Sequence, residues 1–167
     1  MNTIDKLITA LRPIDMEPIM AAYHQLEPDI QWTDYGHKGR QVSLQHKAGD
    51  DPWTSSVGKS QGAEFDYDQI NPYFKNTVFE ELITEFKLTR TRFMWVGPYA
   101  CYSMHRDYTP RVHIPMITNP EAYFVFKHGL IRHLEASSVH WVDTRLFHSF
   151  MNCSDQHRLH MVGIVRE

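Results

Sequence analysis

The sequence predicts a mainly β protein, an antiparallel β-sandwich or barrel with helices packed on its outside. Two observations support this prediction. Helical spacing of apolar residues is confined to the first ninety residues, and from residue 90 onward the apolar positions alternate with a period of two. The chain has 167 residues, 42 % of them hydrophobic, so we expect one domain, residues 1–167, with its own core.

The first part of the chain contains three segments with the apolar spacing of amphipathic helices, namely residues 3–11, 15–26 and 72–86. Pro13 separates the first two. The third carries one apolar stripe of Phe74, Val78, Leu82 and Phe86. Between them, RQVSLQH at 40–46 predicts a short strand, and 47–62 predicts a long loop that could close over a site.

The second part contains seven candidate strands separated by Gly, Pro, Asn and Ser, at residues 90–96, 99–105, 111–117, 122–127, 131–134, 138–143 and 157–165. We therefore expect residues 1–89 to supply helical and loop elements that support a β core, and residues 90–167 to form that core.

Composition excludes several classes of partner. A net charge of -3 gives no basic surface for nucleic acid. The N-terminal residues include acidic side chains and no long apolar run, so we expect neither a signal peptide nor a membrane span. Two cysteines imply no disulfide framework, and we expect a cytoplasmic protein. Eight of the eleven histidines follow residue 100, which places the informative chemistry there.

The ten residues 104–113, MHRDYTPRVH, indicate half of a metal site. Residues i and i+2 of a strand face the same side, so His105 and Asp107 point together. Two histidines and one carboxylate bind non-haem Fe(II) and leave open coordination positions. One more histidine is needed, and the candidates are His113, His128, His133, His140, His148, His157 and His160.

His148 is the best of these candidates, because it follows the apolar segment WVDTRLF and can be held rigidly at a strand edge. Arg158 lies ten residues further on, in the strand HRLHMVGIV that is expected beside the metal strands. A buried arginine there can bind the carboxylate of a dicarboxylic acid through its two-pronged guanidinium. One such acid is 2-oxoglutarate, which would chelate the metal through its keto-acid end.

This order of residues resembles the 2-oxoglutarate/Fe(II)-dependent oxygenases, which have a double-stranded β-helix fold. Within them, HRDYTPRVHIPMITN and WVDTRLFHSFMNCSDQHRLHMV are similar to the aspartyl/asparaginyl β-hydroxylase family, and closest to small members that act on free amino acids, such as L-proline cis-4-hydroxylase. The resemblance covers about residues 92–166. It implies a jelly-roll, cupin-like barrel whose β-helix core, residues 90–167, carries the metal site.

Residue by residue, the resemblance implies His105, Asp107 and His148 as ligands of Fe(II). It implies Arg158 as the partner of the distal carboxylate of 2-oxoglutarate, with Arg111 and His113 helping to position the cosubstrate or an acidic group of the substrate. Further candidates for roles around the site are Trp141, Asp143 and His160, of which Trp141 is expected in the core and Asp143 beside a ligand or in the turn before His148. The large membrane-anchored members lack the carboxylate ligand and use a serine where this chain has Phe93 or Met94.

Simpler interpretations stay open for these residues. His105 and Asp107 alone are also typical of a surface pair or a turn, and Arg111 and His113 of a structural polar network. The string HRD also occurs in the catalytic loop of protein kinases, but here Val112 stands where the metal-binding Asn belongs and no Gly-rich phosphate loop precedes it.

The resulting hypothesis is a dioxygenase that uses Fe(II), 2-oxoglutarate and O2 to hydroxylate an unactivated C–H bond of a free amino acid, proline-like as a first guess. The alternative substrate is an Asp or Asn side chain in a peptide or protein. Two other classes stay open: a cupin-like metal-dependent hydrolase or isomerase, and a binding domain without catalytic activity.

Overall fold

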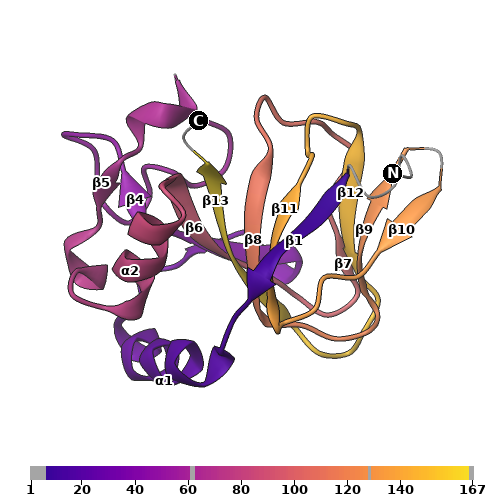
Figure 1. The fold of residues 1–167 in the computed structure, drawn as a ribbon, viewed down its shortest axis with the longest axis horizontal. Coiled ribbons are helices and arrows are strands. Elements are labelled where there is room, and N and C mark those ends of the chain that lie inside the picture. The colour runs from indigo at the N-terminus through magenta and orange to yellow at the C-terminus, as the bar shows by residue number, and fades with distance from the viewer. Residues whose placement is uncertain (1–6, 61–62, 128, 166–167) are drawn as a thin grey trace.

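The computed structural model describes residues 7–60, 63–127 and 129–165, and these form two antiparallel β-sheets with helices against one of them (Figure 1). A seven-stranded sheet has the order β1-β11-β8-β13-β6-β3-β2, a four-stranded sheet has the order β10-β9-β12-β7, and β4 pairs with β5. The strands are β1 Ile8–Pro13, β2 Thr33–Asp34, β3 Gly39–Ser43, β4 Gln45–His46, β5 Gln69–Ile70, β6 Leu88–Val96, β7 Ala100–Cys101, β8 Arg111–Ile117, β9 Ala122–Phe126, β10 Leu130–Arg132, β11 Ser138–Val142, β12 His148–Asn152 and β13 Arg158–Val165.

The helices are α1 Met16–Leu26 and α2 Val78–Glu85, with short 3-10 turns at η2 Glu27–Asp29, η3 Gly36–Lys38, η4 Glu64–Asp66 and η5 Pro72–Phe74. Each α-helix begins at a side-chain cap. The Asp15 carboxylate accepts from the Glu17 N–H, and the Thr77 hydroxyl accepts from the Phe79 N–H. Within the described residues, no helix is long and apolar enough to cross a membrane.

Side chains alternate between the two faces of the seven-stranded sheet. The outer face packs against the helices, and the inner face is turned toward the four-stranded sheet. Phe93 of β6, Val112 of β8 and Leu159 of β13 belong to one core that includes residues of α1 and α2. The alternate residues Arg92, His113 and Arg158 instead line a cavity that residues of the four-stranded sheet line from the other side. Polar side chains on the inner face are therefore directed between the sheets.

The predicted helix at 3–11 is wrong for the described residues, which form strand β1 from Ile8 onward; residues 3–6 lie outside the described part. β1 pairs antiparallel with β11, from Ile8 opposite Val142 to Pro13 opposite Ser138. Leu11 of the supposed apolar stripe is 44 % exposed. Covering the open edge of β11 outweighs a weak helical pattern, because unpaired strand edges carry unsatisfied backbone groups.

Two other predicted elements are shorter than expected. The helix at 72–86 is interrupted at Asn76, which has a φ of +59°, so that η5 ends before it and α2 begins after the Thr77 cap. The strand at 99–105 is reduced to Ala100–Cys101 with one isolated bridge at His105. The helix at 15–26 and the strands at 90–96, 111–117, 122–127, 131–134, 138–143 and 157–165 are confirmed to within two residues at each end.

Candidate metal centre

Two histidines that are far apart in the sequence lie next to each other at the end of the four-stranded sheet. His148 is the first residue of β12, and His105 forms an isolated antiparallel bridge with it. Their ring centroids are 4.5 Å apart. Asp107 lies two residues beyond His105, and one ligand atom from each of the three side chains falls within 4.8 Å of the others. The structure thus brings together the three residues that the sequence suggested as metal ligands.

Backbone carbonyls orient both imidazoles. Nδ1 of His105 lies 2.7 Å from the Ser103 carbonyl oxygen, and Nδ1 of His148 lies 2.9 Å from that of Leu146. A carbonyl only accepts, so Nδ1 carries the proton in each ring and Nε2 keeps its lone pair. This is the second hydrogen bond that metal-binding histidines ordinarily make. Burial lowers the pKa of His148, which keeps this ring neutral and ready to bind a metal.

The loop that carries Asp107 is attached to the turn before His148. The Asp107 N–H donates to the Thr144 carbonyl at 2.8 Å, and the Thr144 hydroxyl donates to the Thr109 carbonyl at 2.9 Å. These bonds fix the two ligand-bearing segments relative to each other, so the site does not depend on the short strand β7 alone.

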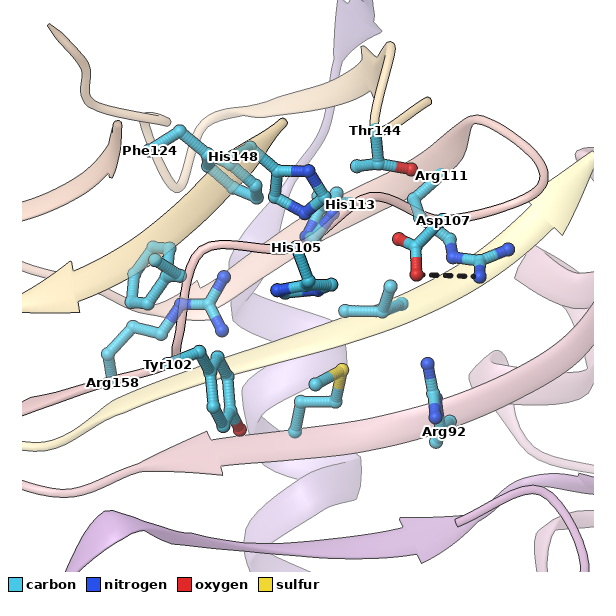
Figure 2. A pocket seen from close by; sticks show the side chains of 13 residues that line it. Arg92, Tyr102, His105, Asp107, Arg111, His113, Phe124, Thr144, His148 and Arg158 are labelled. Carbon is cyan, nitrogen blue, oxygen red and sulfur yellow. Dashed lines mark ion pairs between the residues drawn. The ribbon is translucent and has the colours of Figure 1, made fainter. Parts of the chain in front are cut away.

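A cavity extends from the three residues into the space between the sheets (Figure 2). Its empty volume, open mouth included, is about 470 Å³. The lining is mixed. Apolar residues are Met94, Phe124, Phe150 and Val162, and polar residues besides the three candidate ligands are Arg92, Tyr102, Arg111, His113, Thr144 and Arg158.

Arg158 is buried in this cavity with no carboxylate partner among the described residues. It is 1 % exposed, its guanidinium lies over the Phe150 ring at 3.7 Å, and its Nη2 donates to Nδ1 of His160. Nε has no hydrogen-bond partner in the described structure. Burial lowers its pKa to about 9, still above neutral pH, so the side chain remains a cation. A buried, unpaired cation beside a cavity is costly unless an anion binds there.

His113 and His160 lie behind Arg158. Their Nδ1 atoms are 3.4 Å apart, both side chains are buried, and neither Nε2 has a partner within the described residues. Burial first, and then the charge of Arg158, lower the pKa of both well below 6.5. They are therefore neutral, and His160 accepts a hydrogen bond from Arg158, which helps to hold that guanidinium in place.

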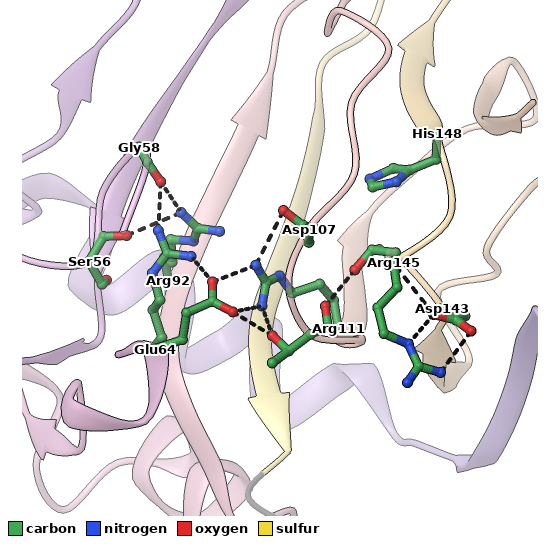
Figure 3. A network of polar contacts seen from close by, with 12 residues as sticks. Ser56, Gly58, Glu64, Arg92, Asp107, Arg111, Asp143, Arg145 and His148 are labelled. Atoms are coloured by element: carbon green, nitrogen blue, oxygen red, sulfur yellow. Dashed lines mark hydrogen bonds and ion pairs between the residues drawn. The ribbon is translucent and has the colours of Figure 1, made fainter. Parts of the chain in front are cut away.

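Arg111 forms ion pairs with two carboxylates (Figure 3). Its Nη2 lies 2.7 Å from Glu64 Oε1 and 3.3 Å from Asp107 Oδ1. Glu64 also binds Arg90 at 2.7 Å and accepts from the Thr109 hydroxyl at 2.6 Å. Burial acts to raise the pKa of Glu64, but the hydrogen bond and charge of Arg111 and the contacts of Thr109 and Arg90 outweigh it and lower the pKa. Glu64 is thus an anion that fixes Arg111 beside Asp107.

Sequence reasoning missed Glu64 and Arg92. Glu64 lies in a loop with no periodicity, and nothing in its neighbourhood of the sequence marked it. Arg92 had a usable signal, because residues i and i+2 of a strand share a face and Arg92 and Met94 both line the cavity.

Trp141 and Asp143 do not line the cavity. Trp141 is on the outer face of β11 and packs against the core beneath the helices. Asp143 accepts from the Arg145 side chain at 2.8 Å and from its N–H, and these contacts lower the pKa of Asp143. It shapes the turn that precedes His148 and does not touch that ring by any described contact.

Several solved structures resemble this chain. An oxidoreductase of the 2OG-Fe(II) oxygenase family from Burkholderia pseudomallei has a TM-score of 0.60 and 13 % identity, covering 87 % of this chain and 76 % of its own. A prolyl-4-hydroxylase from Pseudomonas putida has a TM-score of 0.51 and 14 % identity over 96 % of this chain and 91 % of its own. The DMSP lyase DddQ from Ruegeria pomeroyi has a TM-score of 0.55 and 12 % identity over 95 % and 68 %.

No family model matches the chain, and no curated protein matches it. At such low identity the solved structures show the fold alone, which confirms the predicted jelly-roll, cupin-like class. The donor set itself is informative about a metal. Two imidazoles and one carboxylate suit Fe(II), although Mn, Co, Ni and Zn also accept such ligands. The residues present therefore fit the metal that the sequence suggested.

Proposed function

We propose that this protein is an Fe(II)- and 2-oxoglutarate-dependent oxygenase. The observation that carries the proposal is Arg158, a buried arginine without a carboxylate partner in the described structure, in the same cavity as two histidines and an aspartate. A site for a metal alone gives no reason for this cation. A dicarboxylic cosubstrate does, because one end can bind a metal while the other meets the guanidinium.

In this mechanism His105, Asp107 and His148 hold Fe(II), and Arg158 binds the distal carboxylate of 2-oxoglutarate. When bound, the metal and 2-oxoglutarate would activate O2, so that one oxygen atom goes to the hydroxylated C–H bond and the other to succinate, with CO2 released from 2-oxoglutarate. The protein's task is positioning. Phe124 and Phe150 exclude water around the cosubstrate, His160 orients Arg158, and Arg111 fixes the Asp107 carboxylate.

For the substrate we propose a free amino acid, proline-like as the first compound to test. The support is the similarity of the two motifs to the small members of the aspartyl/asparaginyl β-hydroxylase family. An Asp or Asn side chain in a peptide is the alternative. Succinate formation with free amino acids, compared with formation with peptides, separates the two.

The test of the oxygenase class is anaerobic titration with Fe(II) and 2-oxoglutarate, followed by the weak visible charge-transfer band of a keto acid chelated to iron. We expect a band in the wild type, none in His148→Ala, and a band in Arg158→Ala that needs at least about tenfold more cosubstrate. Metal binding without any band in the wild type would instead favour a hydrolase or isomerase. A protein that binds no metal would favour a binding domain.

A further inference from the structure

The cavity contains a second buried arginine that the proposed function does not use. Arg92 of β6 is 7 % exposed and lines the cavity together with the three candidate ligands. Figure 2 shows Arg92 on the side of the site that carries Asp107, with His105 between Arg92 and Arg158 in this view. In the proposed function Arg158 is occupied by the cosubstrate, which leaves Arg92 without an assigned ligand.

The hydrogen bonds of Arg92 are made to neutral groups. Its Nη1 donates to the carbonyls of Ser56 and Gly58, at 3.1 and 3.0 Å (Figure 3). It also donates to the Gln41 amide oxygen at 3.4 Å. Nε has no partner in the described part of the chain, and no carboxylate there lies within ion-pair distance of this guanidinium. The charge of Arg92 is therefore buried without an ion-pair partner among the described residues.

The neighbouring carboxylates are already engaged. Glu64 is shared by Arg90 and Arg111, and Asp107 contacts Arg111 and is the proposed metal ligand. Three arginines thus face two carboxylates in this part of the site, one of which would give its charge to a metal. Burial, and next the charges of Arg90 and Arg111, lower the pKa of Arg92 to about 9, although the charge of Asp107 acts to raise it.

We propose that Arg92 binds a carboxylate of the substrate. This inference rests on the proposed function, since Arg158 is then occupied by the cosubstrate. Arg111 is paired with Glu64 and Asp107, whereas Arg92 lines the cavity without a carboxylate partner among the described residues. The shared chemistry is a carboxylate close to the C–H bond that is hydroxylated. It can be the α-carboxylate of a free amino acid or the side-chain carboxylate of an acidic residue in a peptide.

A purely structural role makes a different prediction. If Arg92 only anchors the 56–58 segment through its carbonyls, its replacement lowers stability and loosens that segment but does not discriminate between an acid and the corresponding amide. A bound carboxylate does discriminate, because a neutral amide cannot form the charged two-pronged contact with a guanidinium.

The test is calorimetric and needs no turnover. Wild type, Arg92→Met, Arg92→Lys and Arg90→Met are each loaded anaerobically with Mn(II) and saturating 2-oxoglutarate. They are then titrated with the twenty L-amino acids, their carboxamides, and short peptides containing Asp or its amide Asn. Failure of the wild type to bind 2-oxoglutarate contradicts the proposed function itself, so it is scored separately and before any substrate is added.

We expect at least one carboxylate to bind the loaded wild type and its amide to bind about 30-fold more weakly. Arg92→Met should bind the carboxylate about 30-fold more weakly than the wild type does. Arg92→Lys should recover part of this affinity, because it keeps the positive charge but lacks the two parallel N–H donors of the guanidinium. Arg90→Met removes an equal charge from a residue that does not line the cavity, and should keep most of the affinity. No binding of any carboxylate, equal binding of acid and amide, or full affinity in Arg92→Met would overturn the inference.

Discussion

His105 and His148 are joined through their backbones, each donating its N–H to the carbonyl of the other, at N···O distances of 2.9 and 2.8 Å. This pair sets the spacing of the two imidazoles before any metal binds. Each Nδ1 is in addition tied to a carbonyl two residues earlier. The site is therefore preorganised by backbone hydrogen bonds rather than by the rotamer of a single side chain, which limits the entropy lost on metal binding.

Replacing any one candidate ligand should abolish tight metal binding. We expect His105→Ala, Asp107→Ala and His148→Ala each to weaken Mn(II) binding by more than about 100-fold, since changes to the outer partners of metal ligands alone cost 10–100-fold. Calorimetric titration of the purified variants measures this directly.

His157→Ala is the matched control for these variants. It removes a histidine that stacks on Trp95 and does not line the cavity. Its Mn(II) affinity should equal that of the wild type. Undiminished binding in two of the three ligand variants would mean that the metal site lies elsewhere.

Glu64→Gln should lower both stability and metal affinity. The substitution keeps the shape of the side chain but leaves Arg90 and Arg111 without their buried anion, so we expect the free energy of unfolding to fall by about 3 kcal/mol. Because Arg111 then holds Asp107 less firmly, Mn(II) affinity should drop about tenfold. Urea unfolding and calorimetry give the two quantities.

Glu85→Gln serves as the comparison. Its ion pair with Arg12 is half exposed, with side-chain exposures of 50 and 40 %, and should contribute less than about 1 kcal/mol. Equal effects of the two substitutions on metal affinity would show that Glu64 does not act through Arg111 and Asp107.

The strands could be predicted from the sequence pattern more directly than the contacts of the site. Strands β8 and β13 alternate two kinds of residue, one facing the helices and one facing the cavity, so their period was readable. The proximity of His105 and His148 was predicted from the order of the motifs and the family resemblance, not from periodicity, because the two are 43 positions apart and the pairing of β12 with the loop after β7 brings them together. Glu64 shows the same limit, since a loop residue acquires its role from Arg90 and Arg111 of other elements.

The metal-free protein should lose stability as the pH falls below about 6.5. Burial and the Arg158 charge lower the pKa of His113 and His160 in the folded state, so only the unfolded state takes up protons there. Their stabilising contribution is fully present above pH 6.5, and each histidine lowers the free energy of unfolding by up to about 1.4 kcal/mol per pH unit below it. Urea unfolding at pH 7.5, 6.5 and 5.5 tests this.

His160→Gln isolates one of these histidines. The slope of the free energy of unfolding against pH should fall by the contribution of one histidine. The glutamine side chain can still accept a hydrogen bond from Arg158. The lowered pKa of Glu64 acts only below about pH 4.5 and does not interfere. An unchanged slope in this variant would mean that His160 is protonated in the folded protein.

Gly39 is required for the close approach of β3 to β6. A Cβ built there would lie 2.3 Å from the Trp95 carbonyl oxygen, and the backbone cannot move aside because Gly39 is in register with Val96. Gly39→Ala should therefore cost about 3 kcal/mol or more, measured by urea unfolding. The same strand pair places Ser43 opposite Arg92, so the disturbance should also reach the cavity.

Gly49→Ala is the control that distinguishes the steric clash at position 39 from the cost of a positive φ. Gly49 has a φ of +87° and no atom within 4 Å of the added Cβ, so its substitution should cost only about 1–2 kcal/mol, the penalty of a left-handed conformation. The same variants can be titrated with Mn(II) and 2-oxoglutarate. Gly49→Ala should bind as the wild type does, whereas equal stability of the two variants would contradict a tight β3–β6 contact at Gly39.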